Sequence, residues 1–80
     1  MSNTEERLIN CFATVFADLN RDEILRASTA SVAAWDSLAT ITLISVIEEE
    51  FGVSIGQEDF EYMASFDLVR ECLKDKIVNV

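Results

Sequence analysis

The chain has 80 residues, half of them hydrophobic, and a formal net charge of −9. We expect this length to form one domain over residues 1–80, which would bury about 60% of the surface that its unfolded form exposes. The charge argues against nucleic-acid binding, which depends on lysine and arginine side chains that neutralise phosphates. The apolar stretches are shorter than the ~20 residues of a membrane span and the N-terminus lacks the regions of a signal peptide, so we expect a cytoplasmic protein with no membrane span.

The first helix is expected to begin at Ser2 or Thr4, where a capping-box pattern starts, and to end near Ala17. Its buried stripe follows the i, i+4, i+7, i+8 spacing and consists of Leu8, Phe12, Val15 and Phe16. The connection over residues 18–35 is longer than most, so we expect it to be either functional or partly helical. Its expected anchors are Ile24, Leu25 and Val32.

The second helix is expected from Ser37 to Phe51, with Asp36 as its N-cap. At 100° per residue, the side chains divide into two faces. The core face holds Ala39, Leu43, Ile44, Val46, Ile47 and Phe51. The opposite face holds Leu38, Ile41, Thr42, Ser45, Glu48 and Glu49. Leu38 and Ile41 thus form an apolar patch rimmed by acid, which has no obvious purpose if it only meets water, although single exposed aliphatic side chains are normal.

A brief third helix is expected from Gln57 to Met63, with Phe60 and Met63 pointing inward. Ser65 is the expected N-cap of a last helix. The apolar stripe of that helix consists of Val69, Cys72, Leu73 and Ile77. Two glycines and no proline suit helices, so the sequence predicts an all-α fold: a small four-helix bundle of three longer helices and one short helix.

The two cysteines have no metal-ligand spacing and fall at apolar positions of two different expected helices. Cys11 and Cys72 are therefore predicted to be core thiols, because free cysteine is among the most buried residue types.

Acidic residues are unevenly distributed along the chain. Seven of the fifteen fall within residues 36–61, inside the stretch between Arg26 and Arg70 that has no lysine or arginine. They are Asp36, Glu48, Glu49, Glu50, Glu58, Asp59 and Glu61. Such a block should attract partners that carry a basic patch.

Ser37 is the residue in this chain that we expect to be chemically important. Serine is a weak nucleophile at neutral pH and needs an adjacent base, and the sequence contains no histidine. Ser37 is therefore expected to be acted upon rather than to act. A phosphate added in the first turn of a helix would be stabilised there by unpaired backbone N–H groups and by the helix dipole.

The order of a long helix, a long loop, an Asp36-Ser37-Leu38 helix, a short helix and a final helix, on a small acidic chain, resembles the acyl carrier protein family. The resemblance covers essentially all 80 residues. Its most specific part is the segment 35–38, together with the segment 48–52 (Glu-Glu-Glu-Phe-Gly) at the far end of the same helix.

The resemblance implies a bundle of the acyl-carrier type, without catalytic residues and without a metal site. It implies that Ser37 carries a 4′-phosphopantetheine arm, attached by a separate phosphopantetheinyl transferase that uses coenzyme A and Mg²⁺. The thiol of the arm would hold acyl groups as thioesters, and Asp36 would help the transferase and its metal to engage. The docking residues would be Leu38, Ile41, Glu48 and Glu49, which match family positions that meet basic grooves of acyl-activating, synthase or acyltransferase enzymes. We expect a monomer that serves enzymes without being one.

Some positions depart from the common family pattern. Ala34 stands where many relatives have glycine, Trp35 follows it, and Thr42 and Ser45 occupy positions that are often acidic and methionine in carriers of primary fatty-acid synthesis. These differences weaken the docking surface that such synthases expect. They favour a free-standing carrier of a specialised fatty-acid, polyketide or related pathway, and leave open whether the cargo is fatty acyl, polyketide, aminoacyl or hydroxyacyl.

Two other classes of protein are alternatives to a carrier. In a small acidic helical interaction module without a prosthetic group, the patch of Leu38 and Ile41 would bind a partner helix. A divalent-ion sensor is suggested by the acidic block, but no segment fits the calcium loop of an EF-hand. An enzyme acting alone would need a base, a metal cluster or a glycine-rich phosphate loop, and the sequence has none of these motifs.

Overall fold

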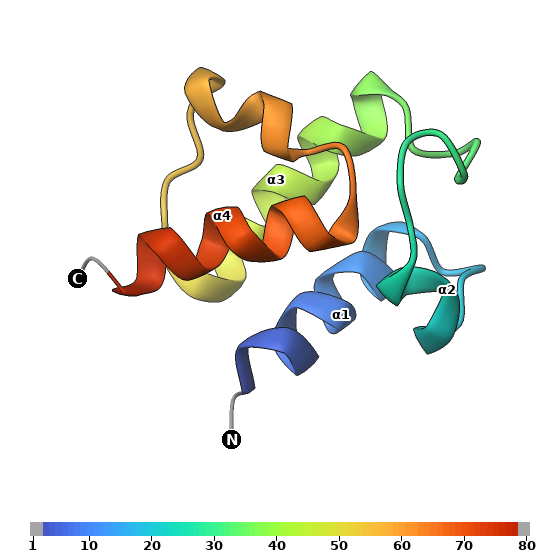
Figure 1. Ribbon diagram of the computed structural model, residues 1–80, viewed down its shortest axis with the longest axis horizontal. Coiled ribbons are helices and arrows are strands. Elements are labelled where there is room, and N and C mark those ends of the chain that lie inside the picture. Colours follow the sequence, from blue (N-terminus) through green and yellow to red (C-terminus); the bar gives the residue numbers. More distant parts are fainter. Residues whose placement is uncertain (1–2, 79–80) are drawn as a thin grey trace.

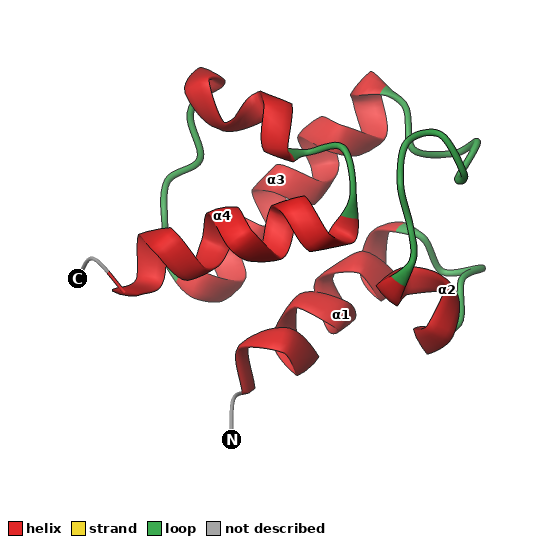
Figure 2. Ribbon diagram, viewed as in Figure 1, coloured by secondary structure: helices red, strands yellow, loops and turns green. Residues whose placement is uncertain are grey.

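The structure is a computed structural model that describes residues 3–78. This part of the chain contains α1 (Asn3–Val15), α2 (Arg21–Leu25), α3 (Ser37–Phe51), the 3₁₀ helix η1 (Gln57–Tyr62) and α4 (Phe66–Val78). It contains no strand, only an isolated bridge between Ser28 and Ser65 (Figure 2). The all-α prediction is confirmed, and α2 is a second short helix beyond the one expected.

Figure 1 shows the arrangement of the helices, with α1 and α2 along one edge and α4 crossing the middle of the view. Helix α1 contacts α3 and α2, while α4 contacts η1 and α2. Three of the four residues in the predicted α1 stripe are buried, and the fourth, Val15, packs partly buried against the core. Helix α1 ends two residues before the expected Ala17, and the expected cap at Ser2 lies outside the described residues.

Aromatic rings form the centre of the core. Phe12 is fully buried, and its ring centroid lies 5.4 Å from that of Trp35 and 5.1 Å from that of Phe66. The ring centroid of Phe16 lies 5.7 Å from that of Trp35. Cys11 and Cys72 are both buried, as predicted. The rings therefore join α1, the segment before α3 and the start of α4 into one core.

The long connection between α1 and α3 is ordered by a short helix and by backbone contacts. Asn20 caps α2 through a capping box, in which its side chain accepts from the Glu23 amide and the Glu23 carboxylate accepts from the Asn20 amide, both at 2.9 Å. Beyond α2, the Thr29 amide donates to the Ala64 carbonyl at 2.9 Å and the Phe66 amide donates to the Ala27 carbonyl at 3.0 Å. The connection is thus partly helical, which is one of its two expected forms.

The prediction that Phe60 points inward is wrong. Its side chain is 47% exposed, whereas that of Met63 is 3% exposed. Helix η1 ends at Tyr62, and Met63 has φ −86° and ψ 41°, which are not helical values. The three-residue spacing therefore does not place Phe60 and Met63 on the same side of one helix.

The C-terminal helix follows its prediction closely. The Ser65 hydroxyl accepts from the Leu68 amide at 3.2 Å and so caps the start of α4. The apolar stripe Val69, Cys72 and Leu73 is buried, and Ile77 packs partly buried against the core.

The two faces of α3 predict different costs for truncating side chains. Leu43→Ala should lower the free energy of unfolding by about 2–5 kcal/mol, because Leu43 is fully buried and its removal leaves a cavity. Ile41→Ala is the matched control: its side chain is 54% exposed, so we expect a change within about 0.5 kcal/mol. Phe51 is half-buried beneath the Arg7 guanidinium, so the loss of unfolding free energy in Phe51→Ala should lie between the losses in these two variants. Urea unfolding measures all three, and equal losses for Leu43→Ala and Ile41→Ala would mean that the faces are assigned wrongly.

Candidate modification site

Ser37 is the first residue of α3 and is exposed. Asp36, as predicted, is the N-cap: its Oδ1 accepts from the Ala39 amide at 2.9 Å, and its carbonyl accepts from the Thr40 amide at 2.9 Å. Within the described part of the chain, this leaves the amides of Ser37 and Leu38 without a partner at the positive end of a 15-residue helix. An anion attached to the Ser37 hydroxyl would therefore find two N–H donors beside it.

Trp35, two residues before Ser37, is tied to the first turn of α3 from inside the core. Its indole Nε1 donates to the Thr40 hydroxyl at 3.0 Å, and that hydroxyl donates to the Asp36 carbonyl at 2.9 Å. Trp35 is 3% exposed and Thr40 is 8% exposed. This pair was not predicted, although a tryptophan next to an N-cap, with a threonine one turn into the helix, is a sequence signal for it.

An apolar surface begins beside Ser37 on the outer face of α3. Leu38 is 74% exposed and Ile41, one turn further along the same helix, is 54% exposed. Thr42, Ser45 and Glu49 are also exposed. The structure thus brings Ser37, Leu38, Ile41 and Glu49 of the predicted site to the solvent-facing side of one helix.

Glu48 differs from the other predicted docking residues because its carboxylate makes a hydrogen bond within the fold. Its side chain is half-buried, and its Oε2 accepts from the Ile55 amide at 2.8 Å. This bond fastens the segment that follows Gly52, which ends α3 in the left-handed conformation with φ 66°. A change at Glu48 would therefore disturb the fold as well as the surface.

Two residues of the acidic block form ion pairs with cations from other parts of the sequence. Arg7 binds Glu50 at 2.7 Å, and Lys76 binds Asp59 at 2.8 Å. Both cations come from outside the block in sequence. Among the described residues, the other members of the block have no cation partner: Asp36, Glu48, Glu49, Glu58 and Glu61. The unpaired carboxylates of the block thus lie on η1, on α3 and at its N-cap.

Neither cysteine offers a reactive group. Burial raises the pKa of the Cys11 thiol to about 11, and burial likewise raises the pKa of Cys72. Both side chains stay protonated near neutral pH, and thiolate is the reactive form.

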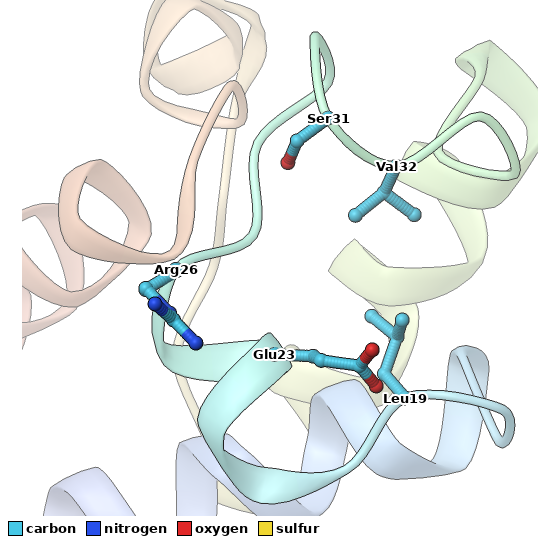
Figure 3. A pocket seen from close by; sticks show the side chains of 5 residues that line it. All are labelled: Leu19, Glu23, Arg26, Ser31 and Val32. Atoms are coloured by element: carbon cyan, nitrogen blue, oxygen red, sulfur yellow. The ribbon is translucent and has the colours of Figure 1, made fainter.

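A small hollow lies between α2 and the connection to α3 (Figure 3). It is lined by Leu19, Glu23, Arg26, Ser31 and Val32. Two of its polar side chains already have partners, since Glu23 Oε1 accepts from the Asn20 amide at 2.9 Å and the Ser31 hydroxyl donates to the Ser28 carbonyl at 3.3 Å. No group of three or more potential metal-ligating residues occurs in the described range.

Comparison of the chain with protein-family models, with curated proteins and with solved structures finds no significant match. Among residues 3–78, no helix combines the length and apolar character required to cross a bilayer.

The ion pair between Asp59 and Lys76 predicts a pH window. The hydrogen bond from Lys76 lowers the pKa of Asp59 from its ordinary 3.8, and the same bond raises the pKa of Lys76 from 10.5. The contribution of Asp59 to stability is present above its ordinary pKa and is lost as pH falls through its lowered pKa; that of Lys76 is present below 10.5 and is lost as pH rises through its raised pKa.

Asp59→Asn should therefore reduce stability most in the middle of this window, and the difference from wild type should shrink toward both extremes. Urea unfolding across pH measures the difference. Glu61→Gln, a similar change at an exposed neighbour without a cation partner among the described residues, is the control and should reduce stability less than Asp59→Asn in the middle of the window. A difference for Asp59→Asn that is constant with pH would contradict the assignment.

Proposed function

We propose that the protein is an acyl carrier protein, in which Ser37 accepts a 4′-phosphopantetheine arm whose thiol then carries acyl groups as thioesters. The observation that carries the proposal is the exposed Ser37 hydroxyl at the N-terminus of α3, with Asp36 capping the helix and Leu38 and Ile41 exposed beside it. The helix order, with a long ordered connection before α3, is compatible with a bundle of the acyl-carrier type.

The chemistry of attachment suits a hydroxyl that lacks its own base. Ser37 oxygen would attack a phosphorus of the coenzyme A pyrophosphate, forming an O–P bond, while the P–O bond to the adenosine bisphosphate half breaks. The transferase would take the serine proton and supply Mg²⁺, because the chain contains no histidine. The phosphodiester that forms is anionic, and the free amides of Ser37 and Leu38 fit that charge.

The outer face of α3 suits a partner with a basic groove. Leu38 and Ile41 provide apolar contact, and Glu49, about two turns beyond Ile41 on the same helix, provides negative charge. Thr42 and Ser45 make the middle of this face neutral, in keeping with a carrier of a specialised pathway. The partner classes are therefore the phosphopantetheinyl transferase and acyl-activating, synthase or acyltransferase enzymes.

Ser37→Ala should abolish modification and leave the fold intact, because the Ser37 side chain is exposed. The chain is incubated with coenzyme A, Mg²⁺ and a promiscuous transferase, and intact-protein mass spectrometry detects the gain of one phosphopantetheinyl group. Ser45→Ala, another exposed serine of α3, is the matched control and should be modified like wild type.

Titration with a thiol reagent gives a second measurement of the same reaction. The untreated native protein should expose no fast-reacting thiol, because Cys11 is 3% and Cys72 is 7% exposed. The modified protein should expose one per chain. A wild-type chain that gains no mass, or a Ser37→Ala chain that does, would overturn the proposal.

Glu49→Lys should slow recognition by the transferase at low salt, because it reverses a charge on the docking face. The loss should shrink as salt is added, since the Debye length falls to about 10 Å at 0.1 M. Glu49 is changed alone, because reversing Glu48 would also remove the acceptor of the Ile55 amide. Asp75→Lys on α4 makes the same charge change away from this face and is the control. Equal rates for both variants at low salt would contradict the docking assignment.

The alternative function is a small acidic interaction module without a prosthetic group. It is favoured by the exposure of Leu38 and Ile41, which would serve a partner helix equally well. The mass measurement separates the two, because a module of this kind gains no phosphopantetheinyl group.

A further inference from the structure

We infer that Trp35 and Thr40 are positioning residues for Ser37: they fix the first turn of α3 from the core side, so that the hydroxyl is held in place when a transferase docks. This inference rests on the proposed function. Neither residue touches the reacting atoms. Trp35 and Thr40 are both buried, whereas Ser37 between them is exposed.

Trp35 is held in the core by its ring contacts and by its indole N–H. Its ring packs against Phe12 with the centroids 5.4 Å apart and the planes at 82°, and against Phe16 at 5.7 Å. The indole N–H is a donor that needs a partner when it is buried. That partner is the Thr40 hydroxyl at 3.0 Å. Trp35 is therefore fixed both by packing and by one directed bond.

Thr40 passes this constraint to the backbone next to Ser37. A threonine hydroxyl has one hydrogen to donate and lone pairs to accept. Here it accepts from Trp35 and donates to the Asp36 carbonyl at 2.9 Å, and the same carbonyl accepts from the Thr40 amide at 2.9 Å. The backbone on the N-terminal side of Ser37 is thus held by Trp35, and that on its C-terminal side by the helix turn closed at Thr40.

The segment that leads into this turn is itself anchored. The Trp35 amide donates to the Val32 carbonyl at 3.0 Å, and the Val32 amide donates to the Ser28 carbonyl at 2.9 Å. Ser28 in turn forms a bridge with Ser65, next to the start of α4. The position of the α3 N-terminus therefore depends on contacts with α1 and α4, and not only on the cap at Asp36.

Positioning predicts a particular kinetic signature. Docking uses the outer face of α3, which Trp35 and Thr40 do not reach, so the KM for the carrier should stay the same when the pair is broken. The rate of transfer depends on the alignment of the hydroxyl with the phosphorus, and small misplacements are costly. A loss in kcat with unchanged KM is the expected result.

Thr40→Val removes the hydroxyl and keeps the shape of the side chain, and Thr40→Ser restores the hydroxyl without the methyl. The full chain is modified by a purified transferase with coenzyme A and Mg²⁺, and kcat and KM for the carrier are measured. We expect kcat to fall about tenfold in Thr40→Val, with KM within about twofold of wild type, and to recover in Thr40→Ser. Trp35→Phe, which keeps a ring but loses the N–H, should resemble Thr40→Val.

Val69→Ala is the control for a general loss of stability, because it truncates a buried side chain of α4 that has no part in the Trp35–Thr40 bond. At a temperature where all variants are folded, Val69→Ala should keep the wild-type kcat. A wild-type kcat in Thr40→Val, or an equal loss in Val69→Ala, would overturn the inference while leaving the proposed function in place.

Hydrogen exchange tests the same inference without any transferase. Thr40→Val should speed exchange of the Ala39 and Thr40 amides and of the Trp35 indole N–H, relative to Val69→Ala and to Thr40→Ser. Unchanged exchange at all three groups would overturn the positioning role. A wild-type chain that is never modified would instead remove the proposed function.

Discussion

The packing of Phe12 is the interaction on which the rest of this small domain depends. Its fully buried ring contacts Trp35, Phe66 and Phe16, with centroids 5.1 to 6.1 Å apart. A chain of 80 residues has little buried area to spare, so a few large rings carry much of its stability. Because Trp35 immediately precedes the N-cap of α3, the same contact that forms the core also sets where α3 begins.

The ion pairs decide where negative charge is left on the surface. Three consecutive α1 residues, at positions 5–7, pair with three different helices: with Arg70 of α4, Arg21 of α2 and Glu50 of α3. Exposed pairs of this kind contribute only about 0.2–1 kcal/mol each. Their larger consequence is that three arginines are used along α1, so the outer face of α3 keeps its carboxylates without cations.

The sequence predicted the features that depend on periodicity and on local capping. The three long helices, the caps at Asp36 and Ser65, and the core face of α3 follow from helical spacing and from residue type. The bounds of α2 were not predicted, because five residues are too few for a periodic signal. Features that depend on distant contacts were not predicted either: the bond from Arg7 to Glu50 joins residues 43 apart. The bond from the Ile55 amide to the Glu48 carboxylate likewise arises only once the chain turns at Gly52.

The fold places the two thiols and the Ser37 hydroxyl in different environments. Its two thiols are buried and held protonated, and its best-placed hydroxyl, that of Ser37, has no histidine in the chain to activate it. What the fold does supply at Ser37 is placement: a capped helix start, free amides and a buried tryptophan behind it. In the proposed carrier, Ser37 is the substrate of a transferase that activates its hydroxyl. On the proposed function, modification would then give the protein the accessible thiol that its own cysteines cannot provide.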